Sequence, residues 1–144
     1  MKTKVLFLCT GNSCRSQMAE GWARHLKSDV IEPYSAGIEK HGLNPKAVEV
    51  MAKAGVDISG QQSNTVAELP TQDFDVVITV CAHADENCPV TLHHAKVVHV
   101  AFDDPPKLAK QAASSEEELN IYRRVRDEIR EFVESLPEAV VDKA

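Results

Sequence analysis

Short apolar runs alternate with amphipathic stretches along most of the chain. Apolar or β-branched runs predict four strands, over residues 4–8, 30–35, 75–80 and 96–102. Apolar positions spaced three or four residues apart predict helices that start near Ser16, near Asn44, and near Ser114 or Ser115. Pro33 marks the second strand as an edge strand. This alternation indicates one α/β domain over residues 1–144, with a parallel sheet and helices on both of its faces.

Composition excludes several classes of protein. The chain has 144 residues, 43% of them hydrophobic, which suits a single core. A net charge of −6 argues against a nucleic-acid-binding surface. No apolar run approaches the roughly 18 residues of a membrane span, and residues 5–8 are too short for the apolar region of a signal peptide. We therefore expect a cytoplasmic protein, in which four cysteines indicate metal or redox chemistry rather than structural disulfides.

Chemically capable side chains stand at the ends of the four predicted strands. Cys9 ends the first, Ser35 the second and Cys81 the third, while Asp103 and Asp104 follow the fourth. In parallel α/β sheets, ligands bind beyond the carboxyl ends of the strands. We therefore expect these groups to share one site.

The first of these strand ends carries the stretch CTGNSCRS, residues 9 to 16. A loop between a strand and a helix can point several backbone N–H groups at one anion, and the helix dipole adds positive potential. Arg15 can pair with two oxyanion oxygens at once. The same field favours the thiolate form of Cys9, and the Ser16 hydroxyl lies in reach of its sulfur.

The expected substrate-binding residues are those of the loop itself. Gly11 removes side-chain bulk, and Asn12 tolerates the left-handed conformation that a tight anion loop needs. Cys14 has no separate chemical task and is expected to pack within the loop. The anion cradle is thus formed by Thr10, Gly11, Asn12, Ser13, Cys14 and Arg15.

CTGNSCRS resembles the anion-binding loop of the low-molecular-weight protein-tyrosine phosphatase superfamily. Ser35-Ala36-Gly37 and Asp104-Pro105 also fall where that superfamily has them. The resemblance implies a four-stranded parallel sheet of order 2-1-3-4. It also implies Cys9 as nucleophile, Arg15 as anion ligand and Asp104 as the general acid that protonates the leaving group.

A second cysteine pair, in VCAHADENCP, leaves three interpretations open. Cys81, His83 and Cys88, with His93 or His94, could bind zinc, although the usual paired spacing of zinc ligands is missing. The two cysteines could be inert packing. They could also form a redox relay that passes oxidation from Cys9 outward by thiol exchange. His83 could tune these thiols or simply be exposed.

The relay resembles that of the thioredoxin-coupled arsenate reductases, a branch of the same superfamily, with Cys9, Cys81 and Cys88 as the matching residues. Gln17 stands where phosphatases usually have a proline, and no aromatic pair follows Asp104. A bare oxyanion therefore suits the site better than an aryl ester. The alternatives are a phosphatase whose extra cysteines protect Cys9 from overoxidation, and a non-catalytic anion or redox sensor.

The resemblance implies a partner and a reaction. Arsenate is attacked by Cys9, Cys81 releases arsenite, and Cys88 completes a disulfide that thioredoxin reduces, with glutaredoxin a less favoured reductant. We expect a monomer that binds neither nucleic acid nor membrane. Asn12, Glu20 and Ser35 match a potassium site of some relatives, but a further aspartate there is Asn64 in this chain. We therefore expect no cofactor and no metal, and potassium only as an option that Asn64 weakens.

Overall fold

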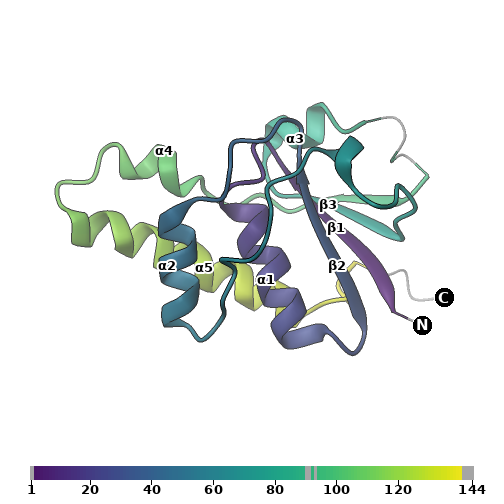
Figure 1. The fold of residues 1–144 in the computed structure, drawn as a ribbon, viewed down its shortest axis with the longest axis horizontal. Helices are drawn as coiled ribbons and strands as arrows, with labels where there is room; N and C mark the ends of the chain where they lie inside the picture. Colours follow the sequence, from purple (N-terminus) through teal and green to yellow (C-terminus); the bar gives the residue numbers. More distant parts are fainter. Residues whose placement is uncertain (1, 90–91, 93, 141–144) are drawn as a thin grey trace.

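The computed structural model describes residues 2–89, 92 and 94–140, and its centre is a parallel sheet (Figure 1). The four strands stand in the order β2-β1-β3-β4, and every neighbouring pair is parallel. Their bounds are β1 Thr3–Cys9, β2 Ile31–Gly37, β3 Val76–Thr79 and β4 Lys96–His99. The order, the parallel pairing and the edge position of Pro33 in β2 confirm the sequence prediction.

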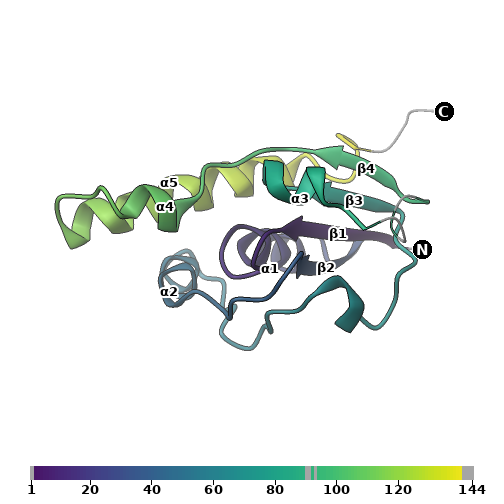
Figure 2. The same ribbon diagram turned by 90° about the horizontal axis from the view of Figure 1, so that it is seen from above.

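Helices cover both faces of this sheet. Their bounds are α1 Arg15–Lys27, α2 Pro45–Lys53, η1 Val66–Glu68, α3 Ala82–Glu86, α4 Pro105–Ala109 and α5 Ser115–Glu134. Figures 1 and 2 show α1 and α5 packed together on one side, whereas α3 and η1 lie on the other. Right-handed crossovers from a central β1 produce this two-sided arrangement.

The helix ends follow the capping signals in the sequence. The Asn44 side chain accepts hydrogen bonds from the backbone N–H groups of Lys46 and Ala47, ahead of Pro45. Ser114 accepts from Glu117 N at the start of α5. Gly55 follows α2 with a φ of 87°, a conformation that only glycine adopts easily.

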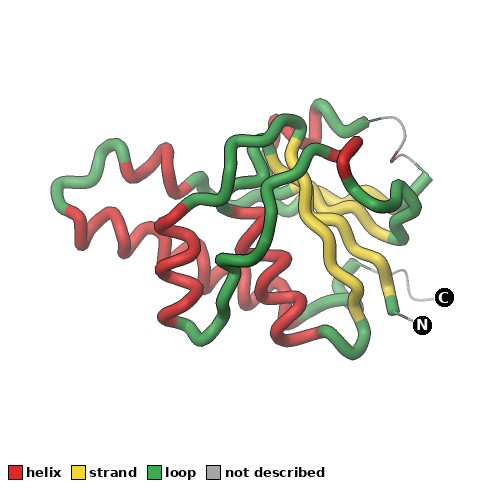
Figure 3. The backbone as a smooth tube through the Cα atoms, in the orientation of Figure 1, coloured by secondary structure: helices red, strands yellow, loops and turns green. Residues whose placement is uncertain are grey.

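The register of the sheet gathers the strand ends at one edge. Cys9 pairs with Gly37 of β2, and Leu8 pairs with Thr79 of β3. Val80 N then donates a hydrogen bond to Leu8 O. This contact places the next residue, Cys81, beside the loop that follows β1. In Figure 3 the chain leaves the strands as loops at this edge, which is where the candidate site forms.

Two parts of the chain differ from the prediction. The fourth strand was expected to reach residue 102 but ends at His99. Beyond it, Val100 N and Phe102 N still donate to Thr79 O and Val80 O, but the chain diverges because β3 has already turned into α3. The short helices α3 and α4 were not predicted, since five residues carry too little periodicity to be recognised.

Within 2–89, 92 and 94–140, no helix combines the length and the apolar character that crossing a bilayer requires.

Candidate active site

The loop after β1 wraps around Cys9 at the start of α1. Cys9 is buried, and its sulfur lies 2.9 Å from the Ser16 hydroxyl oxygen. The Ser16 oxygen accepts a hydrogen bond of 2.8 Å from the Asn12 side-chain amide. The Ser16 hydrogen is therefore available to Cys9, where it stabilises negative charge on the sulfur.

Asn12 holds the shape of the loop. It has a φ of 49°, the left-handed conformation expected of it, and it is fully buried. Its Oδ1 accepts from Asn64 N at 2.8 Å and from Gln17 Nε2 at 3.1 Å, and its carbonyl accepts from Gln17 at 2.9 Å. Gln17, where the phosphatases usually have a proline, thus contributes donors that fix the loop backbone.

Arg15 and Asp104 face one another across the mouth of the loop. An Arg15 guanidinium nitrogen lies 3.7 Å from an Asp104 carboxylate oxygen, and another donates to Phe102 O at 3.1 Å. The Arg15 side chain is largely buried, whereas that of Asp104 is 38% exposed. Asp103 instead faces outward and pairs with Arg124 at 3.0 Å. Of the two aspartates, only Asp104 is positioned to donate a proton to a bound anion.

A pocket of about 220 Å³ lies between these groups. Besides Cys9, Arg15 and Asp104 it is lined by Thr10, Gly11, Ser13, Cys14, His41 and Pro106. Asn12 does not line it, because its side chain lies beneath the loop. A pocket of this size, with an arginine, a helix start and a buried thiol, suits a small tetrahedral oxyanion.

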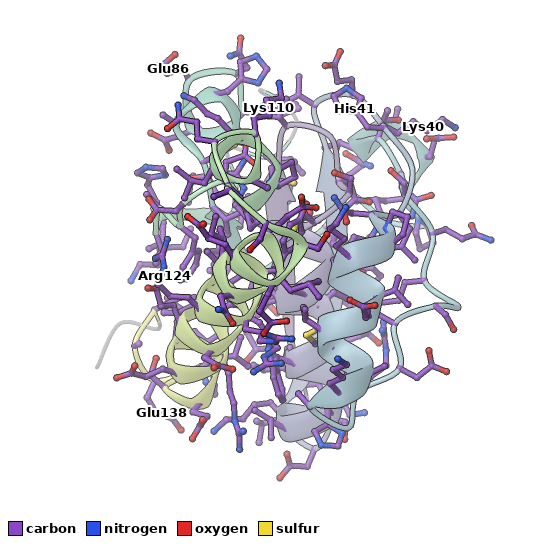
Figure 4. The ribbon with its side chains drawn as sticks, turned by 90° about the vertical axis from the view of Figure 1, so that its left-hand side faces the viewer. Lys40, His41, Glu86, Lys110, Arg124 and Glu138 are labelled. Atoms are coloured by element: carbon purple, nitrogen blue, oxygen red, sulfur yellow. The ribbon has the colours of Figure 1, made fainter. Side chains whose placement is uncertain are left out.

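His41 is a pocket residue that sequence reasoning missed. Its backbone N–H donates to Gly11 O at 2.9 Å, and its ring covers Gly11 so closely that an added Cβ would lie 2.3 Å from it. His41 Nε2 is 2.8 Å from a Glu39 carboxylate oxygen. Its only sequence signal is that it follows the end of β2. Figure 4 shows His41 and Glu86 at the same end of the molecule, away from Glu138.

Cys14 behaves differently from Cys9. It is 4% exposed, and this burial raises the pKa of its thiol well above the ordinary range despite the neighbouring Arg15. Cys14 therefore stays a neutral thiol that packs within the loop.

Cys81 lies directly beside the anion loop. Its sulfur is 3.3 Å from the Thr10 hydroxyl oxygen and accepts from Ala84 N at 3.4 Å. Thr10 immediately follows Cys9, and Cys81 is buried. The third strand therefore delivers a second thiol to the residue next to the nucleophile.

Cys88 lies just beyond α3 and is partly buried. Burial raises the pKa of its thiol, and the Asp85 carboxylate raises it further. The segment between the two cysteines is held by few contacts, among them a 3.1 Å hydrogen bond from the Thr79 hydroxyl to Asp85. Cys9 and Cys81 are both free thiols in this structure.

The three residues that match a potassium site of some relatives, Asn12, Glu20 and Ser35, all have hydrogen-bond partners within the protein. The Ser35 hydroxyl donates to Glu20 at 2.5 Å, and Arg24 contacts the other Glu20 oxygen at 2.5 Å. Asn12 is engaged by Ser16, Gln17 and the Asn64 backbone. A guanidinium therefore supplies positive charge at the Glu20 carboxylate.

The zinc interpretation depended partly on His93, which lies outside the described residues. Among the residues that the structure describes, no three histidine, cysteine, aspartate or glutamate side chains converge as metal ligands would. His94 instead lies 3.6 Å from Asp73.

Comparisons with known proteins agree with this geometry. A family model described as low molecular weight phosphotyrosine protein phosphatase matches residues 4–144. The sequence is 48% identical over 137 residues to an arsenate reductase of Halalkalibacterium halodurans, covering 95% of this chain and 96% of that protein. A solved arsenate reductase "in the phosphate binding state" superposes with a TM-score of 0.80 at 35% identity, over 98% of this chain and 100% of that one. Another, "in oxidized state", gives 0.77 at 34% identity, with the same coverage of both chains.

Proposed function

Since the chain belongs to the low molecular weight phosphotyrosine protein phosphatase family, we propose that it is an arsenate reductase that converts arsenate to arsenite through three cysteines. The observation that carries the proposal is the position of Cys81, whose sulfur touches Thr10 next to the nucleophile. A hydrolase of this family needs only Cys9, Arg15 and Asp104. The similarity to arsenate reductases over nearly the whole of both chains supports the same conclusion.

The first step forms a bond between Cys9 and arsenic. Arsenate binds to the backbone N–H groups of residues 10–15 and to Arg15, and the Cys9 thiolate attacks the arsenic atom. An As–O bond breaks, and Asp104 supplies the proton with which that oxygen leaves as water. The Ser16 hydroxyl stabilises the thiolate before the attack.

The second step reduces arsenic. The Cys81 thiolate attacks the Cys9 sulfur, an S–S bond forms, and the S–As bond breaks with its electron pair left on arsenic. Arsenic(V) becomes arsenic(III), which departs as arsenite, and a Cys9–Cys81 disulfide remains. The position of Cys81 two residues beyond the end of β3, next to Thr10, favours this exchange over reduction by an external thiol.

The third step returns Cys9 to its thiol form. Cys88 attacks Cys81 and produces a Cys81–Cys88 disulfide, which an external dithiol reduces. We propose thioredoxin as that dithiol rather than glutaredoxin, because the three-cysteine arrangement matches the thioredoxin-coupled branch. We further propose that the protein is a cytoplasmic monomer. We propose no resident cofactor, because Arg24 already balances the charge of the Glu20 carboxylate.

The test is arsenate-dependent consumption of NADPH in the presence of thioredoxin and thioredoxin reductase. The wild-type chain should turn over repeatedly, whereas Cys88→Ser should release one arsenite per chain and stop. Omission of arsenate is the matched control for both proteins. Normal turnover by Cys88→Ser would disprove the relay, and the absence of arsenite with retained phosphate-ester hydrolysis would favour the phosphatase alternative.

A further inference from the structure

A histidine lies at the end of a short hydrogen-bonded chain that starts at Cys81. The Thr10 hydroxyl oxygen is 3.3 Å from Cys81 Sγ and 3.2 Å from His83 Nδ1. Cys81 is 7% exposed, whereas the His83 side chain lies at the surface on α3. The buried thiol therefore contacts a solvent-exposed imidazole through a single hydroxyl group.

We propose that His83 is a positioning residue that draws the Cys81 proton through the Thr10 hydroxyl and so sets the rate of arsenite release. This inference rests on the proposed function, because only a reductase needs Cys81 as a nucleophile. In this proposal His83 accepts the Cys81 proton, a task for which the anion loop and the other cysteines provide no group.

The chemistry of a hydroxyl group permits this relay. A threonine hydroxyl has one donor hydrogen and two acceptor lone pairs, so it can accept from a thiol while it donates to an imidazole nitrogen. As the Cys81 proton moves to the Thr10 oxygen, the Thr10 hydrogen moves to His83 Nδ1. The products are a thiolate and an imidazolium joined by the regenerated hydroxyl, so every proton is accounted for.

The products are stabilised on both sides. The Cys81 sulfur also accepts from Ala84 N at 3.4 Å, a contact that strengthens once the sulfur is charged. The imidazolium faces solvent, which hydrates its charge. When Nδ1 of His83 carries no hydrogen, its lone pair can accept the hydrogen that the Thr10 hydroxyl donates across 3.2 Å.

The elements packed against α3 carry few other titratable groups. β1 has Cys9 at this end and Lys4 at the opposite end, the Val76–Thr79 strand has none, and α3 itself has Asp85 and Glu86. All of these groups are unchanged in variants of His83 and Thr10. A difference in pH dependence between such variants and the parent therefore reports on the relay.

The experiment is single-turnover arsenite release in a Cys88→Ser parent without thioredoxin, measured from pH 6 to 9. His83→Ala should slow release about tenfold at pH 7, a rise of about 1.4 kcal/mol in the barrier, and release should recover at high pH. Thr10→Val should slow release at least as much, and Thr10→Ser, which retains a hydroxyl, should retain the effect of His83. Because both groups act in one relay, His83→Ala should add little to Thr10→Val.

Two controls separate the possible failures. His94→Ala alters an exposed histidine that pairs with Asp73, away from the anion loop, and should leave the release rate unchanged. If the Cys88→Ser parent itself releases no arsenite, the proposed function fails. If the parent releases one arsenite and His83→Ala matches it in rate and pH profile, the reductase stands and the role of His83 is disproved.

Discussion

At the scale of single residues, Cys9, Cys14 and Cys81 differ in the hydrogen-bond donors that surround their sulfur atoms. Cys9 has a hydroxyl donor, Ser16, on its sulfur, and Cys81 contacts the Thr10 hydroxyl and a backbone N–H. Cys14 is enclosed by the loop with no such donor on its sulfur among the described contacts, and burial raises the pKa of its thiol. Position relative to donors therefore decides which thiols can become nucleophiles.

Cys14 should make the free energy of unfolding depend on pH in the alkaline range. Its folded-state pKa is raised, so above the ordinary thiol pKa of 9.0 the unfolded chain loses a proton that the folded chain keeps. The free energy of unfolding should therefore fall as pH rises beyond that value, by about 1.4 kcal/mol per pH unit from this group. Below it, the contribution is fully present.

The measurement is urea unfolding of the wild type and of Cys14→Ala between pH 8 and pH 10. All other titratable groups are common to both proteins, so the difference in slope isolates Cys14. The wild type should lose stability faster above pH 9. Equal slopes would show that the Cys14 thiol ionises as easily in the folded chain as in the unfolded one.

At the scale of elements, the proposed relay requires α3 to change shape during the reaction. Along a helical path, the seven residue steps from Cys81 to Cys88 would place the ends about 10 Å apart. A disulfide requires α-carbons within about 7 Å. Little apolar burial holds α3 in place, since Ala84 is its one buried residue, and the Thr79–Asp85 hydrogen bond ties it to β3. The helix is therefore stable enough to position Cys81 and weak enough to open.

Hydrogen exchange should detect this opening. In the oxidised chain, the amides of Asp85 and Asn87, which donate to Cys81 O and His83 O in the reduced form, should exchange faster. Amides in the core of β1 should not change. In the reduced chain, Thr79→Val should accelerate exchange in α3 by removing the Asp85 contact. Equal protection of α3 in both redox forms would contradict the opening.

The sequence predicted the long elements well because their patterns repeat. The apolar run of β1, the Asn44-Pro45 start of α2 and the Ser114 cap of α5 are local signals, and each lies where it was expected. α3 and α4 were missed because five residues complete little more than one helical turn. The strand expected to reach residue 102 ends at His99, since strand length depends on the neighbour β3.

Some residues of the candidate site could be predicted from the sequence, and others could not. The loop residues are recognisable from their spacing, because they lie within one turn between a strand and a helix. Asp104 was distinguished from Asp103 by the resemblance to the phosphatase superfamily. His41 and the Thr10–His83 contact depend on which loops meet at the edge of the sheet. That information is tertiary, so no local pattern could reveal it.

At the scale of the whole molecule, the sheet order explains why the chemistry is concentrated at one edge. β1 lies between β2 and β3, so its loop has Gly37 on one side and Cys81 on the other. α1 and α5 bury the core beneath it, with Trp22 donating to Arg126 O at 3.1 Å. The anion site is therefore built on β1, one of the two interior strands of the sheet.

Anion binding should consequently stabilise the entire chain. A ligand that binds only the folded state adds about 2.7 kcal/mol at one hundred times its dissociation constant. Arsenate or phosphate should raise the melting temperature of the wild type, measured by calorimetry, and should have little effect on Arg15→Ala. An equal increase in both proteins would place the anion somewhere other than the loop.

The central claim, that oxidation passes from Cys9 through Cys81 to Cys88, is tested most directly by mapping disulfides by mass spectrometry. The reduced chain is given one equivalent of arsenate without thioredoxin and is then alkylated. The wild type should contain a Cys81–Cys88 bridge with Cys9 free, and Cys88→Ser should contain a Cys9–Cys81 bridge. Release of arsenite by a wild-type chain whose Cys81 and Cys88 both remain thiols would contradict the account.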